Sequence, residues 1–528
     1  MKSLAMLSYA VVAAGISISQ PVTAQPAPQA LGKVHFETSC TPEAAAAFDR
    51  AMLYQHSFWY RASQRSFEAA LKADPGCGIA YWGIALSLLW NPHAAPPAKN
   101  LTEGATAIAK GKEVGAKTER ERDCLTALSA MYTDYDKVDH RTRVLNYAKA
   151  MEQLAAKYPN DDEAQILYAI SLNVSASPSD KTYANQLKGA AILEKIWDRQ
   201  PDHPGIAHYL IHLYDTPALA EKGLTAARRY AKVAPDAPHA LHMPSHIFTR
   251  VGYWQESIDS NAASARAAKA DHEAADQLHA MDYEVYAYLQ LGQDARAKAV
   301  IDEMMSVKGF SETFQAAPYA MAASPARYVV ERGDWKGAAA LEVRPNPLPH
   351  IVAITWFARG LGAARSGDTA LAEMAIAQLA TLRDALREKK DAYWAEQVDI
   401  QGQVATAWLL MAQGRKDEAL AKMSAAADAE DKTEKSPVTP GPLAPARELY
   451  GAMLLEQGKA PEALVAFEAT LRKEPNRLNA FLGAAAAASA AGDSAKARQY
   501  FAAAAKQASD ASVERADVIK ARALAAAK

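Results

Sequence analysis

GIAHYLIHLY (Gly205–Tyr214) and HALHMPSHIF (His239–Phe248) carry the same histidine pattern and begin 34 residues apart. Their apolar residues recur at helical spacing, without the alternation of a strand. A helical sequence that repeats every 34 residues or so is typical of a solenoid built from two-helix units. The sequence therefore predicts an all-α fold, a right-handed α-solenoid of about ten helical pairs without a sheet.

A second pattern marks the downstream half of the chain. A glycine ends the first helix of each predicted pair, and a small residue follows five positions later. The glycines are Gly252, Gly292, Gly333, Gly367, Gly414, Gly458 and Gly492, and the small residues are Ser257, Ala297, Ala338, Ala372, Ala419, Ala463 and Ala497. Glycine permits a tight turn, and a small side chain lets two paired helices approach closely.

In the last units, Phe467 and Phe501 come nine residues after their glycines, and Pro475 closes one repeat. This skeleton resembles the tetratricopeptide repeat (TPR) over most of residues 41–510. The resemblance implies that the first helix of each pair lines a concave groove and that ligands bind there. The phrases HSFWY, AHYLIHLYD, PHALHMPSHIF and LHAMDY also resemble a group of exported bacterial TPR proteins. That resemblance implies a fold and a compartment rather than a reaction.

The chain is expected to contain several segments. They are a signal peptide (1–24), a leader (25–33), an N-terminal TPR-like array with a histidine-rich groove (34–310), middle TPR-like repeats (311–428), a linker (429–445) and a C-terminal pair of repeats (446–528). The linker, AEDKTEKSPVTPGPLAP, is identified by its proline and its charge.

The start of the chain is typical of a secretory signal. Lys2 precedes the mostly apolar stretch Leu4–Ser19, and the small residues around Ala24 offer a cleavage site. We therefore expect a periplasmic or secreted protein. No later segment is long and apolar enough for a membrane span, so no membrane insertion is expected once the signal is removed. The net charge of -2 gives no electrostatic reason to expect nucleic acid.

Three cysteines are present, so an exported chain leaves at least one unpaired. Cys40 precedes the first helical pair and Cys77 lies in the turn after it, which predicts a disulfide between them. Cys124 is expected to be a free, buried helix residue. Three buried free thiols remain the alternative.

Histidines cluster strongly: eight of the thirteen lie between His203 and His279. Seven donors occupy equivalent places in three consecutive units: His208, His212, His239, His242, His246, His279 and Asp282. Residues four apart share a helix face, and neighbouring repeats stack, so these donors are expected to converge. Six imidazoles exceed one tetrahedral site. The pattern favours a two-metal site, or one metal with supporting histidines, with zinc first and copper, nickel or iron as alternatives.

Two other interpretations stay open: a metal-free polar groove, and histidines that serve structure alone. Pro244 also interrupts the spacing between His242 and His246. Proline removes one helical hydrogen bond and clashes with the preceding turn, so the helix must kink or begin there.

Four further residues are candidates for contacting a ligand in the groove: Arg250, Tyr286, Arg327 and His56. A solvated surface charge explains Arg250 and Arg327 equally well, and core packing beside Trp59 is the favoured explanation for His56. His203 and His272 fall in turns and are expected to be exposed.

No phosphate loop, nucleophile elbow, CxxC pair or HExxH motif is present in the sequence. We therefore expect an exported binding scaffold whose groove carries a metal and accepts a protein, a peptide or a small ligand. The alternative is a metal-dependent enzyme, a hydrolase or an oxidoreductase. Three or four protein ligands with an open position facing a pocket would favour that alternative.

Overall fold

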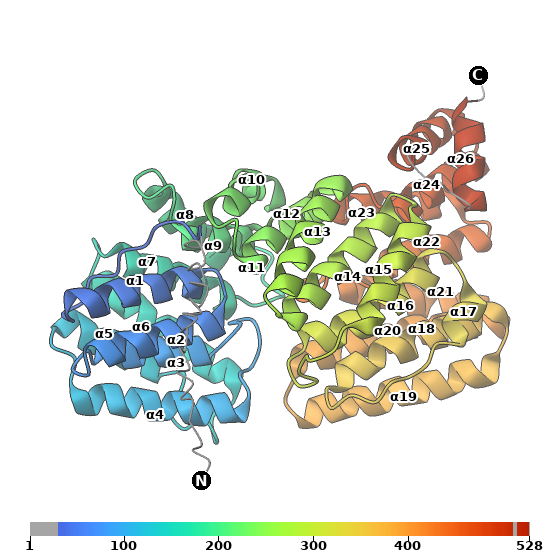
Figure 1. Ribbon diagram of the computed structural model, residues 1–528. Helices are drawn as coiled ribbons and strands as arrows, with labels where there is room; N and C mark the ends of the chain where they lie inside the picture. Colours follow the sequence, from blue (N-terminus) through green and yellow to red (C-terminus); the bar gives the residue numbers. More distant parts are fainter. Residues whose placement is uncertain (1–29, 510–514, 527–528) are drawn as a thin grey trace, which may run out of the picture.

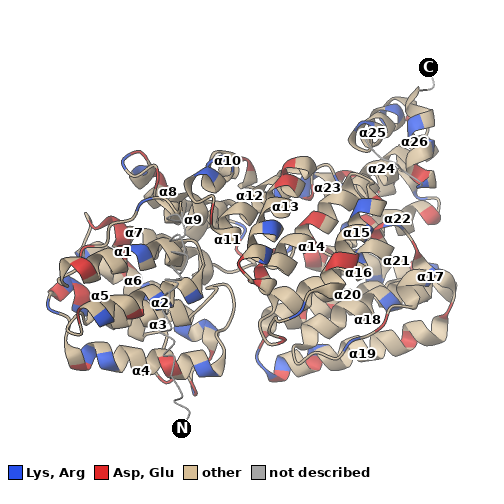
Figure 2. Cartoon of the chain, in the orientation of Figure 1, with Lys and Arg blue, Asp and Glu red and all other residues tan. Residues whose placement is uncertain are grey.

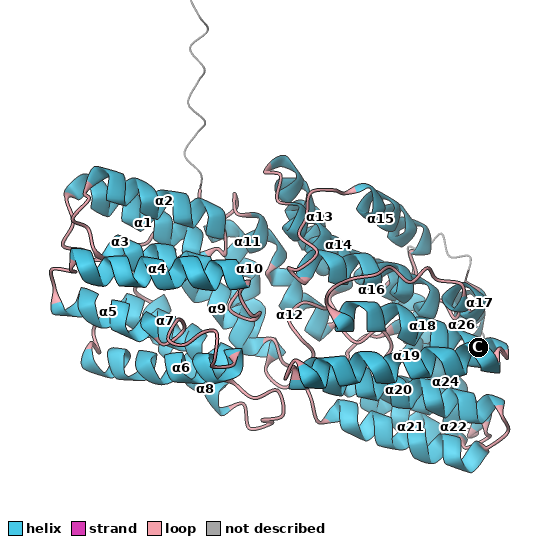
Figure 3. Cartoon of the chain, turned by 90° about the horizontal axis from the view of Figure 1, so that it is seen from below, coloured by secondary structure: helices cyan, strands magenta, loops and turns pink. Residues whose placement is uncertain are grey.

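The computed structural model describes residues 30–509 and 515–526. The predicted signal peptide and most of the leader lie outside these residues. Helices and loops make up the whole described part, which holds no strand (Figure 3). The all-α expectation is confirmed.

The first helices form an N-terminal lobe, at the left of Figure 1. Its elements are α1 (Pro42–His56), α2 (Tyr60–Ala73), α3 (Ile79–Leu88), α4 (Ala98–Val114), α5 (Glu119–Ser129), α6 (His140–Lys157), α7 (Asp162–Ser175), α8 (Ala184–Trp197), α9 (Pro204–Tyr214), the short 3₁₀-helix η1 (Ala220–Gly223) and α10 (Leu224–Val233). Two short helices, α11 (Pro238–His242) and α12 (Pro244–Val251), form a waist after it.

The remaining helices form a C-terminal lobe on the other side of the waist (Figure 1). They are α13 (Trp254–Ala270), α14 (Ala274–Gln290), α15 (Asp294–Ser306), α16 (Ala316–Glu331), α17 (Trp335–Ala339), α18 (Pro349–Ser366), α19 (Thr369–Glu388), α20 (Ala392–Ala412), α21 (Lys416–Asp431), α22 (Ala446–Glu456), α23 (Ala460–Lys473), α24 (Leu478–Ala490), α25 (Ser494–Gln507) and α26 (Ala516–Ala526). Consecutive helices pair, and first helices of successive pairs also touch, as in α14, α16, α18 and α20. That arrangement is an α-solenoid.

The glycine pattern accounts for the helix ends of the downstream pairs. All seven predicted glycines have positive φ, from 65° at Gly333 to 87° at Gly367, a region that costs other residues steric strain. The small residues that follow are all buried, with Ala497 the most exposed at 6%. At Gly252 a Cβ would also collide with the carbonyl oxygen of Pro475. Both features predicted from sequence are confirmed.

The segment between α21 and α22 is packed rather than extended through solvent. Helix α21 continues to Asp431, and no residue of 433–444, all described, is exposed. We call residues 433–444 the strap. The hydroxyl of Tyr283 donates to the carbonyls of Pro437 and Thr439 at 2.9 and 3.0 Å. Proline and charged residues of the predicted linker 429–445 thus meet partners within the folded chain, among them Tyr283, Arg327 and Asp215.

The C-terminal repeats fold back onto the start of their own lobe. The Arg477 guanidinium is buried and pairs with Glu331 of α16 at 2.7 Å and with Glu448 of α22 at 2.6 Å. The indole of Trp254 donates to the carbonyl of Asn476 at 2.8 Å. These contacts join α13 and α16 to the α23–α24 turn, so the C-terminal lobe closes on itself.

Cys40 and Cys77 form a disulfide, with Cα atoms 5.0 Å apart, and Cys124 is free and buried. This is the pairing that the sequence analysis predicts. The bridge ties the start of α1 to the turn before α3.

Acidic and basic residues alternate over the helices without a face of one sign in this view (Figure 2). None of the helices in the described residues is long and apolar enough to cross a membrane.

Candidate metal centre

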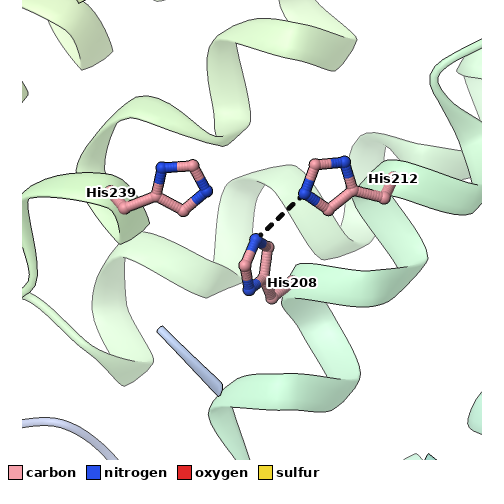
Figure 4. A group of neighbouring side chains, drawn as sticks. All are labelled: His208, His212 and His239. Atoms are coloured by element: carbon pink, nitrogen blue, oxygen red, sulfur yellow. Dashed lines mark hydrogen bonds between the residues drawn. The ribbon is translucent and has the colours of Figure 1, made fainter. Parts of the chain in front are cut away.

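Two groups of three histidines lie at the waist. The first triad is His208, His212 and His239; the second triad is His242, His246 and His279. Within each triad, one ring nitrogen per residue lies within 4.8 Å of the other two. Figure 4 shows the first triad, with nitrogens of three rings turned toward a common centre. The six predicted histidines are therefore brought together as two adjacent sets of three.

The repeat supplies each triad in the same way. A first helix provides two histidines four residues apart, α9 for the first triad and α11–α12 for the second. Their Nε2 atoms are 3.1 Å apart in His208 and His212. The third histidine comes from the next unit. The rings of His212 and His246 approach to 5.9 Å between centroids, so the triads adjoin.

Pro244 does interrupt the helix, as expected, but the spacing survives. Helix α11 ends at His242 and α12 begins at Pro244. Met243 between them keeps helical angles, φ -54° and ψ -35°. The Nε2 atoms of His242 and His246 consequently remain 3.0 Å apart.

The first triad is oriented by a backbone group. The Nδ1 of His208 donates to the carbonyl oxygen of His56, at the end of α1, at 2.6 Å. The ring of Phe58 packs against the His208 imidazole, with centroids 4.3 Å apart. Burial in this setting lowers the pKa of His208 to about 3. His208 is therefore neutral at physiological pH, with Nε2 bare.

The second triad is oriented by side chains. Asn261 of α13 donates through Nδ2 to the carbonyl of Ser257 at 2.6 Å, which assigns its Oδ1 as an acceptor. The Nδ1 of His242 donates to that oxygen at 2.6 Å. The Nδ1 of His246 donates to the Asp215 carboxylate at 2.9 Å. Both imidazoles thus carry their proton on Nδ1.

Asp215 is a buried carboxylate held by two cations. Arg250 donates to it at 2.7 Å, and the ammonium of Lys435, from the strap, lies 3.2 Å away. Burial would raise the pKa of Asp215, but Lys435, Arg250 and His246 together hold it well below its usual value. Asp215 is therefore ionised and a strong acceptor for His246.

The facing Nε2 atoms of His242 and His246 pose an electrostatic problem. With the protons on Nδ1, two lone pairs meet across 3.0 Å. A cation must lie between them, either a proton on one ring or a metal ion. Burial lowers the pKa of both histidines, which opposes the proton. Two ligands about 2.1 Å from one ion, at angles between about 90 and 110°, lie roughly 3.0–3.4 Å apart, so the geometry fits a metal ion.

A third cluster, His56, Glu163 and His203, is structural. The Nε2 atoms of both histidines meet the Glu163 carboxylate, at 3.0 and 2.7 Å, and Tyr209 Oη lies 3.0 Å from His56 Nδ1. Each carboxylate oxygen of Glu163 is thus engaged by one imidazole, so the cluster is held together by its own hydrogen bonds. The expectation that His203 is exposed is wrong: it is 1% exposed, because its turn packs over Glu163. His272 is exposed, as expected.

Asp282, the seventh predicted donor, belongs to neither triad among the described residues. Its carboxylate accepts from Ser324 at 2.9 Å and lies 3.9 Å from the Arg327 guanidinium. Burial raises the pKa of Asp282 to about 6, against the opposing effects of Arg327 and Ser324. It points toward α16 rather than toward the imidazoles.

The other predicted ligand contacts are used inside the protein. Arg250 is bound to Asp215, and Arg327 donates to the strap carbonyl of Pro442 at 2.9 Å. The Tyr286 hydroxyl accepts from Arg477 at 3.1 Å. His56 is fully buried. Each of these four side chains is thus engaged by a partner within the folded chain.

Several residues of this centre were not predicted from the sequence. They are His93, Asp215, Asn261, Tyr283 and Lys435. Two of them had a signal in the local sequence. Asp215 directly follows the histidine-containing stretch Gly205–Tyr214, and Tyr283 directly follows Asp282, one of the predicted donors. His93 lies in the loop after α3, with its ring 4.6 Å from that of His212. Nothing local connects it, Asn261 or Lys435 to the triads.

A cavity of about 130 Å³ adjoins both triads. Its imidazole wall consists of His93, His212, His239, His246 and His279; Phe58, Trp59, Tyr60, Trp90 and Phe314 supply aromatic walls, and Ser436, Pro437 and Val438 of the strap close one side. Residues of the strap therefore form part of the wall of this small pocket.

No protein-family model and no curated protein matches the chain. Among solved structures, it is similar to the TPR domain of P58(IPK), at 16% identity over 69% of this chain and 98% of that one, with a TM-score of 0.21. It is also similar to the APC/C hetero-tetramer Cut9–Hcn1 (10% identity, 91% and 96% covered, TM-score 0.30). A third similarity is to yeast Tom70 (13% identity, 91% and 95% covered, TM-score 0.27). Likenesses this weak say nothing about a ligand or an activity.

Proposed function

We propose that this protein binds two transition-metal ions, one at each histidine triad. The observation that carries the proposal is the pair of bare Nε2 atoms in His242 and His246, 3.0 Å apart in a site where burial opposes protonation. In the first triad the Nε2 atoms of His208 and His212 lie 3.1 Å apart, and that of His208 is bare because its Nδ1 donates to the carbonyl of His56. Hydrogen bonds from Nδ1 to fixed acceptors are the usual support for a metal-binding imidazole.

The donor set limits the kind of metal. Three neutral imidazoles without thiolate or carboxylate suit zinc, copper, nickel or iron, and disfavour calcium and magnesium. Zinc is the first choice because it commonly takes three histidines and keeps a fourth position for another ligand. The Asp215 carboxylate behind His246 strengthens that imidazole as a donor.

We place the protein outside the cytoplasm, as a binding scaffold of the periplasm or the extracellular space. The Cys40–Cys77 disulfide supports an oxidising compartment. A small ligand suits the groove better than a protein or peptide, because the strap fills the groove beside the triads and leaves about 130 Å³.

Metal-dependent catalysis is the second candidate function. It is favoured by one observation: each triad offers only three ligands, and histidines of both triads line the pocket. An ion held this way keeps a position open toward the pocket, which is the arrangement of catalytic rather than structural sites. A hydrolase or an oxidoreductase would suit such a centre.

Metal analysis of the protein purified without an affinity tag tests the first proposal. We expect about two equivalents of one transition metal per chain, after reconstitution if necessary. His272→Ala is the matched control, since this exposed imidazole lies outside both triads. No bound metal after reconstitution with zinc, copper, nickel and iron in turn would refute the proposal. Turnover that depends on the metal would establish the second candidate.

A further inference from the structure

About half of the residues that line the pocket beside the triads carry flat rings. On one side are imidazoles, and on the others are aromatic side chains from three different segments, among them Phe58, Trp90 and Phe314. The rings of Trp90 and Phe314 meet edge to face, 5.4 Å apart, across the gap between the two lobes. A cavity of about 130 Å³ is close to the roughly 150 Å³ in which a dry protein cavity binds benzene. The space fits a single six-membered ring.

Two of these aromatic residues hold strained backbone positions. Phe58 and Trp90 follow the ends of α1 and α3 and have φ of 54° and 56°. At the corresponding place after α14, α20, α22 and α24 the chain has glycine, which adopts this conformation freely. A bulky residue there costs stability, and such strain is retained where surrounding contacts or function require the side chain. Both side chains line the pocket.

Polar groups in the pocket lack partners. The hydroxyl of Tyr60 and the Nε2 of His93 are buried without a hydrogen bond, as are nitrogens of His239 and His279. Unsatisfied buried polar atoms are costly and point to a ligand that carries a hydrogen-bonding group. A purely apolar ring would leave them unpaired.

The far rim of the pocket is acidic. Glu273, just before α14, and Asp276, in its first turn, line the pocket together with one guanidinium, that of Arg61. Burial and then Glu273 raise the pKa of Asp276 to about 7. A further negative charge is unfavourable beside these carboxyl groups, so a neutral ligand fits better than an anionic one.

We propose that this pocket binds a neutral single-ring phenol, with the ring between the aromatic walls and the hydroxyl oxygen facing the histidine triads. The hydroxyl has two kinds of partner there. A metal ion held by a triad would accept the hydroxyl oxygen as a further ligand, which rests on the proposed function. In the metal-free protein the hydroxyl donates a hydrogen bond to a bare imidazole nitrogen. The pocket can therefore be tested separately from the metal.

Calorimetric titration with phenol tests the proposal, on the metal-loaded and the metal-free chain. We expect saturable binding with one phenol per chain, tighter when metal is present. Cyclohexanol lacks the flat ring, toluene lacks the hydroxyl, and benzoate lacks both the hydroxyl and the neutral charge. Each should bind about tenfold more weakly than phenol or worse. Equal binding of cyclohexanol, or no binding of phenol in either form, overturns the proposal.

Trp90→Gly is the decisive variant. Glycine suits the positive φ of this position, so the melting temperature should stay within about 2 °C of wild type or rise, while phenol binding falls about tenfold. Phe314→Ala should weaken phenol binding in the same direction. Phe310→Ala is the control, since it lies in the same loop but outside this pocket.

Metal content, measured on each variant, separates the two proposals. Full metal content with unchanged phenol affinity in both Trp90→Gly and Phe314→Ala overturns the pocket inference alone. A wild-type chain that binds phenol but no metal overturns the proposed function and leaves the pocket inference supported.

Discussion

The two triads have the same three imidazoles in the same repeat-derived arrangement, yet their supporting groups differ. In the first triad, His208 donates to a backbone carbonyl of α1, a neutral acceptor. In the second, His246 donates to the Asp215 carboxylate, which Arg250 and Lys435 keep ionised. A carboxylate behind an imidazole makes it a stronger donor than a carbonyl does. Repetition thus supplied equivalent ligands, and the surrounding helices made the two sites unequal.

The difference has a consequence for metal affinity. We expect the second triad to bind its ion more tightly than the first. Asp215 also connects the second triad to the strap, because it pairs with Lys435, 220 positions later in the sequence. The first triad has no charged partner of this kind among the described residues.

Acid should abolish both sites at once, the largest effect that we expect. Burial holds the pKa values of the six triad histidines below the unfolded value of 6.5, that of His208 at about 3. Below pH 6.5 the unfolded chain therefore binds more protons than the folded one. The contribution of these histidines to the free energy of unfolding is fully present above pH 6.5 and is lost as the pH falls toward 3. Each fully buried imidazole contributes about 1.4 kcal/mol per pH unit in this window. Melting curves of the metal-free protein between pH 7.5 and 4 measure this loss of stability. A melting temperature that stays constant over this range would contradict the prediction.

Removing one ligand from one triad at a time tests the two metal sites separately. His242→Ala should lose the metal of the second triad, and His208→Ala that of the first, each leaving about one equivalent. A bound ion at a hundred times its dissociation constant stabilises the fold by about 2.7 kcal/mol, so the melting temperature should fall with the metal. Elemental analysis and calorimetry measure both quantities. Loss of both metals in either variant would mean that the triads form one inseparable site.

Asp215→Asn should make the triads more alike. We expect metal affinity of the second triad to fall about tenfold to a hundredfold, with little change at the first. The folded state should also lose stability, because Arg250 and Lys435 remain buried without their carboxylate. Asp198→Asn, at an exposed end of α8, is the control. Competitive metal titration measures both affinities, and an equal loss at both triads would argue against the proposed asymmetry.

Asn261→Ala tests the neutral partner in the second triad and should have the smallest effect. His242 would lose one hydrogen bond to an uncharged acceptor, which contributes about 1 kcal/mol, so affinity should fall less than about tenfold. The same titration measures it. A larger loss than in Asp215→Asn would show that orientation matters more here than charge.

Much of the solenoid could be predicted from sequence, because its signals are local. The glycines at positive φ and the small residues five positions later act within one helical pair. The paired histidines were predictable for the same reason, since four-residue spacing fixes one face of a helix. Even the break at Pro244 was visible, although its small effect on the distance from His242 to His246 was not.

Other parts of the centre could not be predicted. His203 lies in a turn, as the sequence indicates, but whether a turn is exposed depends on what packs over it, here Glu163. Asp282 matches the histidine positions in the repeat. Its carboxylate nevertheless turns to Ser324 and Arg327 of α16, and these long-range partners have no signal in the local sequence.

The sequence by itself determined the helical pairs, the disulfide partners at the first pair and the six imidazoles on neighbouring faces. Only the tertiary structure decided which groups orient those imidazoles: a carbonyl 152 positions from His208, and a lysine 220 positions from Asp215. Helix formation and stacking depend on spacings of a few residues and on the repeat length. The fold-back of the strap and the small pocket depend on the accumulated curvature of many repeats, which no local pattern encodes.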